Sequence, residues 1–232
     1  YSVIQQHDAV SDEPVGEPIS LDDNAWVMEY TPDGALLAAA DWDQIRLIDP
    51  GGTRPDTLVD MGGRIRDMVF DRAGAYVAVA VGPEVRFIDY PGGSEVFPAV
   101  SHAVVVDHIA VDAHGEMLAT VTTDSLTRVW DIATGEQIGE ALPPSAGVYD
   151  VAFHPHAKRL ATADGDGNVI FWDIDTGRQY GTPISVPGGV REILFTPDGA
   201  NLFTGGNSGA ALRWRLPVPP ASEEEMEQRT WA

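Results

Sequence analysis

Two short segments of the sequence carry side chains that could bind a metal ion. Residues 164–168 read Asp-Gly-Asp-Gly-Asn, the spacing of oxygen ligands that opens a calcium-binding loop. The sixth position of such a loop requires Gly and is Val169 here, and the twelfth requires Glu and is Asp175. Residues 154–156 read His-Pro-His, which could hold a transition metal or supply a general base. We interpret both segments as turns between strands and predict no metal and no other cofactor.

Motifs of nucleophilic or phosphate chemistry are missing from the sequence. It contains no Gly-x-Ser-x-Gly nucleophile turn, no phosphate-binding glycine loop and no paired-carboxylate motif. It also contains no cysteine, which excludes thiol and disulfide chemistry and leaves the compartment open, with a cytoplasmic location favoured over a secreted one. We therefore predict that the chain is not an enzyme.

The elements that hold these segments are short strands. Residues 160–173 contain two of them: Leu160, Thr162 and Asp164 alternate with small residues, and residues 169–172 are β-branched or aromatic. Asp166 and the glycine after it supply the conformational freedom of a tight turn. This segment therefore reads as a β-hairpin.

The hairpin recurs along the chain with a period of 40 to 42 residues. The residue that closes the first strand of each unit is Tyr30, Phe70, Val111, Phe153 or Phe195. The residue that closes the third strand is Asp8, Asp49, Asp89, Asp131 or Asp173, with Arg215 in the sixth place. A period of this size with several short strands predicts an all-β fold, a β-propeller in which each repeat is one blade and the blades stack to bury their faces.

The repeats resemble those of WD40-repeat proteins over nearly the whole chain. The resemblance rests on Val129-Trp130-Asp131 and Phe171-Trp172-Asp173, on the Leu-Ala-Thr segments at 118–120 and 160–162, and on Thr-Pro-Asp-Gly turns at 31–34 and 196–199. It implies four strands per blade, a to d, running outward from a central channel. The chain end, with Leu-Pro and a Pro/Glu segment, resembles bacterial, planctomycete-like WD40 arrays, some of which carry a Ser/Thr kinase domain upstream.

The alignment of the repeats divides the chain into three parts. Residues 16–20 align with 181–185, so residues 1–20 are predicted to be strands c and d of a blade that lacks strands a and b. Residues 21–216 hold the propeller repeats, with complete blades near 25–60, 65–98, 105–142 and 148–185 and a final a-b-c set at 190–216. Residues 217–232 are predicted to be a Pro/Glu linker and the start of a helix, with Ser222 and Glu225 as a capping box.

Two ways of completing the ring remain open. The strand at 15–20 could complete the sheet at 190–216 and close a five-bladed ring. We favour the alternative, in which the chain is the C-terminal part of a larger ring of about seven blades. Free sheet edges would then need another segment or another chain to cover them.

The resemblance also implies structural hydrogen bonds within blades. WD40 blades often contain a tetrad of His, Ser or Thr, Asp and Trp. The blade at 105–142 could form one from His102, Thr120 or Thr122, Asp124 and Trp130. The next blade offers Thr162, Asp166 and Trp172 without a histidine.

The same resemblance places one residue of each repeat at the channel mouth, where family members most often bind partners. These residues are Trp26, Arg66, Asp107, Tyr149 and Arg191, and the b–c turns add Trp42, Asp43, Asp124 and Asp166. Trp, Tyr and Arg dominate interface hot spots, so we predict a protein-binding surface. The alternative is that these positions vary because they face solvent.

Charge restricts the partners further. The formal net charge is −22, so nucleic acid and anionic membranes would be repelled, and a protein or peptide partner is predicted. The favoured function is a non-catalytic interaction scaffold or sensor, and the alternative is a regulatory domain of a larger signalling enzyme such as a Ser/Thr kinase or ATPase. A propeller hydrolase with a channel metal would need inward His or Glu at one repeat position in several blades, and we expect no such row.

Overall fold

The computed structural model describes residues 2–8, 10–21, 25, 27–90, 92–143, 146–206 and 209–216. Strands, turns and loops make up all of this part of the chain, so it offers no helix that could cross a membrane. Two sequence predictions, the mouth position of Trp26 and the capping box in residues 217–232, lie outside the described residues.

The strands form six antiparallel sheets that follow one another along the chain. The first is a hairpin of β1 (Ser2–His7) and β2 (Pro14–Leu21). The second contains β3 (Val27–Tyr30), β4 (Leu37–Ala40), β5 (Gln44–Ile48) and β6 (Thr57–Asp60). The third contains β7 (Ile65–Phe70), β8 (Val77–Val81), β9 (Glu84–Ile88) and β10 (Glu95–Ser101).

The remaining three sheets repeat the same order. The fourth contains β11 (Val106–Val111), β12 (Met117–Thr122), β13 (Thr127–Asp131) and β14 (Gln137–Leu142). The fifth contains β15 (Val148–Phe153), β16 (Arg159–Asp164) and β17 (Asn168–Asp173), whose outer edge is covered by β18 (Arg178–Gln179) and β19 (Ile184–Ser185). The sixth contains β20 (Glu192–Phe195), β21 (Asn201–Gly205) and β22 (Ala211–Arg215).

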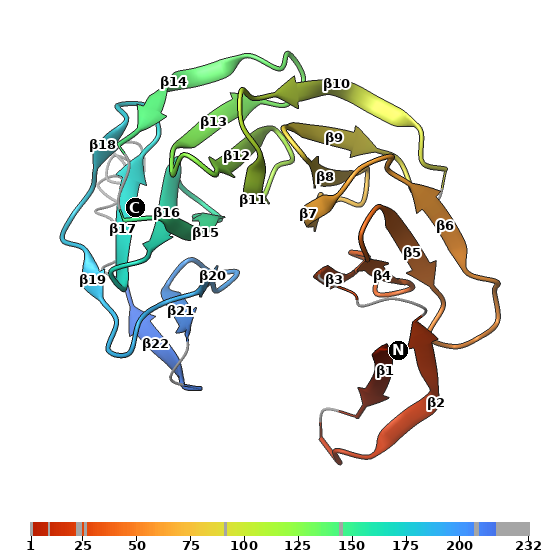
Figure 1. The fold of residues 1–232 in the computed structure, drawn as a ribbon. Coiled ribbons are helices and arrows are strands. Elements are labelled where there is room, and N and C mark those ends of the chain that lie inside the picture. The colour runs from red at the N-terminus through yellow and green to blue at the C-terminus, as the bar shows by residue number, and fades with distance from the viewer. Residues whose placement is uncertain are drawn as a thin grey trace, which may run out of the picture.

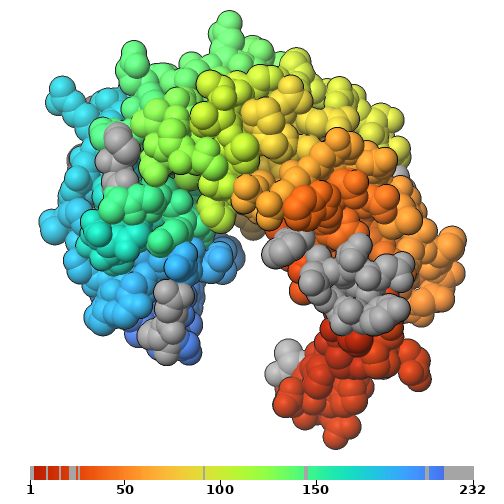
Figure 2. All heavy atoms as spheres, viewed as in Figure 1, coloured from red at the N-terminus to blue at the C-terminus, as the bar shows by residue number. Residues whose placement is uncertain are grey.

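The sheets stand side by side around a central hollow, and Figure 1 shows them as an arc with β3, β7, β11, β15 and β20 on its inner side. This arrangement confirms the predicted all-β propeller architecture. The arc is open between β22 at one end and the β1–β2 hairpin at the other, as the space-filling view in Figure 2 also shows.

The core lies between neighbouring sheets and not within any one of them. Second strands such as β4 and β8 are buried on both faces, and alanines there, including Ala38 and Ala78, are 0% exposed. Their small side chains let the next sheet approach closely. Between the third and fourth sheets the gap is filled by Phe87, which meets Tyr76 and Phe97 edge to face.

The Thr-Pro-Asp-Gly turns fold as the sequence predicts for hairpins. The Thr31 hydroxyl donates to Asp33 Oδ1 at 2.6 Å, and the Gly34 amide donates to the Thr31 carbonyl at 2.7 Å. Gly34 has a φ of 69°, which a residue with a side chain rarely adopts. The hydrogen bond from Thr31 holds the pKa of the Asp33 carboxyl below its usual value.

The two ends of the arc do not meet. β2 pairs with β1, and within the described residues β22 pairs only with β21, so the five-bladed closure through residues 15–20 is not formed. The last sheet also exposes large apolar side chains, with Leu194 67% and Phe203 39% exposed. A larger ring remains a prediction with which both observations agree.

Candidate functional site

Residues at the predicted channel mouth contact each other in pairs across neighbouring sheets. Arg66 on β7 and Asp107 on β11 form an ion pair, with 3.5 Å between Nη1 and Oδ1. The Arg191 guanidinium lies over the Tyr149 ring, 3.9 Å from its centroid. Each pair therefore bridges two blades and fixes the side chains of both partners at the rim.

A second aromatic and arginine contact lies at the b–c turn of the second sheet. Trp42 is 54% exposed, and the Arg64 guanidinium lies 4.5 Å from the centroid of its ring. The Trp42 carbonyl accepts a hydrogen bond from the Ile65 amide, which ties this turn to the start of β7. Trp42 is thus an exposed aromatic side chain on a backbone that two sheets hold.

The b–c turns predicted beside this surface are ordered by local hydrogen bonds to aspartate side chains. Asp124 Oδ1 accepts the Thr122 hydroxyl at 2.6 Å, which lowers the pKa of the Asp124 carboxyl. The amide of Asp166 donates to Asp164 Oδ1 at 3.1 Å, and the amide of Asp43 donates to Asp41 Oδ1 at 3.3 Å. Each of these turns is therefore held by an aspartate carboxylate of its own.

The structure brings three of the four tetrad candidates together. Thr120 Oγ1 lies 2.9 Å from His102 Nε2 and accepts the indole N–H of Trp130 at 2.9 Å. His102 Nδ1 is buried without a hydrogen-bond partner, and burial lowers the pKa of the ring. Asp124 does not join this group, because its partners are Thr122 and Arg128.

The Trp to Thr hydrogen bond recurs in the next two sheets. Trp172 Nε1 donates to Thr162 Oγ1 at 2.9 Å, and Trp214 Nε1 donates to Thr204 Oγ1 at 3.0 Å. Asp166 stays in its turn and does not contact this pair. The repeated bond pins the third strand to the second in three successive blades.

These bonds give a stability prediction. Replacement of Thr120 with Val should destabilise the chain by about 2 kcal/mol, because a buried indole N–H and a buried imidazole nitrogen lose one shared partner. Thr204→Val is the matched control, because it removes a single bond and should cost about 1 kcal/mol. Urea unfolding followed by circular dichroism would measure both, and equal costs would contradict a role for His102 in this group.

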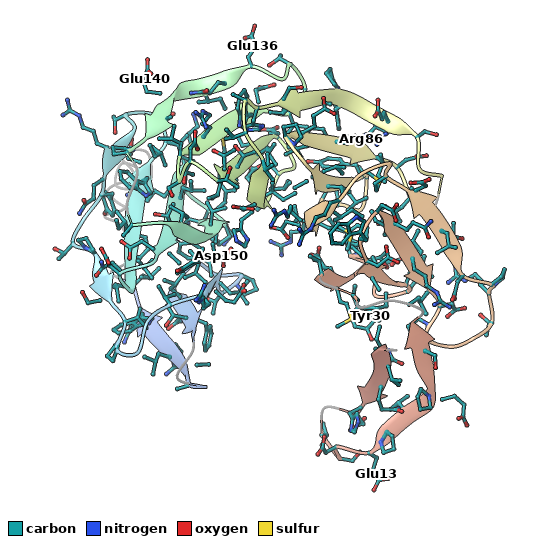
Figure 3. The ribbon with its side chains drawn as sticks, in the orientation of Figure 1. Glu13, Tyr30, Arg86, Glu136, Glu140 and Asp150 are labelled. Atoms are coloured by element: carbon teal, nitrogen blue, oxygen red, sulfur yellow. The ribbon has the colours of Figure 1, made fainter. Side chains whose placement is uncertain are left out.

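Sequence reasoning missed a set of carboxylates that joins neighbouring sheets at the inner rim. Asp67 Oδ2 accepts the amide of Ile109 in the next sheet at 2.9 Å, and Asp150 Oδ2 accepts the amide of Ile193 at 2.7 Å. Glu29 Oε2 accepts the amide of Phe70 at 3.1 Å. Figure 3 places Asp150 at the inner side of the arc, facing the hollow.

Each of these carboxyl groups is desolvated by burial. Burial raises the pKa of Asp150 to about 7, although its hydrogen bonds from backbone amides act in the opposite direction and nearby Glu192 adds to the rise. Burial likewise raises the pKa of Asp67 to about 6 and that of Glu29 to about 7. The inner joints between sheets therefore depend on groups that change their charge near neutral pH.

One repeat position carries an ionisable side chain in four successive sheets. Asp67, His108, Asp150 and Glu192 all stand three residues before the end of an inner strand. The signal was present in the sequence, one position after the mouth residues. Two of these groups bind the next sheet through its backbone, and His108 Nδ1 lies 3.8 Å from Asp67 Oδ2.

Side chains of both segments that could hold metal make contacts within the protein. The Asp164 carboxylate accepts the amide of Asn168 at 2.8 Å as well as that of Asp166. His156 Nε2 lies 2.8 Å from the Pro197 carbonyl, and the His154 ring packs on Phe195. Over the described part of the chain, no three His, Asp or Glu side chains are grouped as metal ligands would be.

Comparison with known protein families finds a match for one of the repeats. The family model of the WD domain, G-beta repeat, matches residues 137–173, which run from β14 to the end of β17. One repeat of the chain is therefore similar to the WD40 repeat. No curated protein matches the sequence.

The fold comparison covers most of the molecule. A chain of the solved structure described as "Crystal Structure of Mitotic Checkpoint Complex" aligns with 93% of this chain and 71% of its own length, with a TM-score of 0.78. The two sequences are 16% identical, so the likeness is one of fold. The shared fold extends beyond the matched repeat to most of the arc.

Proposed function

We propose that the chain is a non-catalytic interaction module that binds a protein or peptide partner at the channel mouth. The observation that carries the proposal is the pairing of Tyr149 with Arg191 and of Arg66 with Asp107 across sheet boundaries. Three of these side chains stand on inner strands and Arg191 directly precedes β20, so the pairs are formed before a partner arrives and binding would cost little conformational entropy. With Trp42 exposed nearby, the surface combines the residue types that dominate interface hot spots.

The charge of the chain supports a protein partner over other classes. A net charge of −22 opposes binding to nucleic acid and to anionic lipid, whereas arginines at the rim offer local contacts for acidic or aromatic groups. Propellers of the WD40 type commonly mediate protein–protein interaction, which agrees with this assignment.

A selected peptide would test the proposal. Peptides displayed on phage are selected on the immobilised chain, and the best binder is titrated calorimetrically against purified variants. Tyr149→Ala/Arg191→Glu should weaken that binding by at least about ten-fold, because it removes one bridged pair at the rim. Glu136→Arg/Glu140→Arg is the control, since Figure 3 shows both glutamates pointing away from the outer rim. Unchanged binding by the rim variant would contradict the proposal.

The alternative, a regulatory domain of a larger signalling enzyme, is favoured by the open ends of the arc. Leu194 and Phe203 on the last sheet present an apolar face of the kind that neighbouring sheets cover elsewhere in the molecule. In that case the chain would contribute the interaction surface of a bacterial protein whose chemistry resides in other domains.

A further inference from the structure

Among the described residues, the sixth sheet has no outer strand, unlike the four larger sheets before it. β22 pairs with β21, and along the part of the chain that the structure describes no strand covers its other edge. In the fifth sheet the corresponding edge of β17 is covered by β18 and β19. The free edge of β22 therefore exposes backbone groups that could pair with an incoming strand.

A groove of about 250 Å³ runs beside this free edge. Its walls combine aromatic and apolar side chains with arginines, among them Tyr180, Ile184, Trp214, Arg159 and Arg215. The Arg159 guanidinium is stacked on the Tyr180 ring at 3.8 Å, so the groove is already ordered. Such a groove suits the side chains of a strand laid along β22.

The charges along β22 indicate what kind of strand would fit. Arg213 and Arg215 are both exposed, at alternate positions on one face of the strand. The chain as a whole has 14 Lys and Arg against 36 Asp and Glu, so two neighbouring arginines make this edge unlike its surroundings. An acidic strand would be attracted here and a basic one repelled.

The segment that follows β22 in the chain is poorly suited to this role. Pro217, Pro219 and Pro220 carry no amide hydrogen, and because Pro219 and Pro220 are adjacent, one of them falls at a donating position in either register. We propose that the free edge of β22 binds an acidic, extended segment of a partner protein, which adds to the sheet as its fourth strand. The inference does not depend on binding at the channel mouth.

Residues 11–21 of the chain are an acidic segment of this kind. Their alignment with the fifth sheet predicts how such a segment would pair with β22. Residues 16–20 align with 181–185 of the fifth sheet, an offset of 165, and β22 aligns with β17 at an offset of 42. Since Asp173 pairs with Arg178, the register places Glu13 opposite Arg215. Since the Tyr180 amide donates to the Phe171 carbonyl at 2.7 Å, it places the Val15 amide at the Arg213 carbonyl.

A synthetic peptide of residues 11–21 is therefore a suitable probe for the full chain. In the free peptide both edges are available, whereas in the folded chain β2 is paired with β1. We expect the fluorescently labelled peptide to bind in an anisotropy titration and to bind more weakly as salt is added. Arg213→Glu/Arg215→Glu should weaken binding at least about ten-fold, while Arg178→Glu, a single charge reversal on the exposed β18, should leave it unchanged.

A modified peptide separates strand addition from simple charge attraction. Methylation of the Val15 amide keeps every charge but removes the hydrogen bond to Arg213, so it should reduce binding at least about ten-fold. Equal binding by the methylated peptide, or by a peptide with Asp12, Glu13 and Glu17 replaced by Lys, would overturn the proposal. Self-association of the chain that the peptide fails to displace would assign the edge to a second copy and would also overturn it.

Discussion

Phe87→Ala is expected to destabilise the chain by about 3–5 kcal/mol, which is the usual cost of removing a fully buried aromatic ring. Phe87 is 0% exposed and meets Tyr76 and Phe97 edge to face, with ring centroids 5.7 and 5.9 Å away. The ring belongs to the cluster between the third and fourth sheets, so its loss leaves a cavity at a joint of the arc. The total stability of a folded domain is only about 5–15 kcal/mol, so this variant should be close to unfolding.

Urea unfolding monitored by circular dichroism would measure this cost. Phe87→Leu keeps most of the volume and should lose about 1–2 kcal/mol, which separates the cavity from the loss of aromatic contacts. Phe203→Ala is the matched control, because that ring is 39% exposed on the open face of the last sheet. Similar losses for Phe87 and Phe203 would contradict a core located between the sheets.

The fold was largely predictable from the sequence because its signals are local and repeated. Thr31 and Gly34 form their turn within a few residues, and Trp130, Trp172 and Trp214 each find the threonine ten positions before them. The all-β propeller architecture follows from repeating such units. Closure of the ring did not follow, since pairing between β2 and β22 would depend on the relative positions of the two ends of the arc.

The candidate site was less predictable because its contacts join neighbouring repeats. The pairing of Arg66 with Asp107 and of Tyr149 with Arg191 spans about one repeat, and neither residue of a pair identifies the other in the sequence. Asp150 is similar, because its carboxylate is explained only by the Ile193 amide of the next sheet. A reader of the sequence would have to compare the same column in adjacent repeats to find these groups.

The carboxylate at Asp150 leads to the second large effect, which depends on pH. Asp150→Ala leaves the buried amides of Val151 and Ile193 without their acceptors and is expected to cost about 2–3 kcal/mol at about pH 6. The pKa of Asp150 is about 7 in the folded chain, above that of an ordinary Asp, so the folded state binds the proton more tightly than the unfolded state. The stability linked to this proton is present at low pH and is lost as the pH rises through 7.

The cost of Asp150→Ala should therefore be smaller at about pH 8 than at about pH 6, by about 1 kcal/mol. The variant is compared with the parent chain at each pH, so that the contributions of other titrating groups to the free energy of unfolding cancel. These groups include the histidines whose pKa values burial lowers. Asp175→Ala is the control, because that exposed carboxylate pairs with exposed Lys158 and its loss should have little effect at either pH. A cost that rises with pH would mean that Asp150 is stabilised as an anion. The contact between β15 and β20 would then be an ordinary hydrogen bond to a charged Asp150 carboxylate. It would not be strongest when the Asp150 carboxyl group is protonated, as we expect.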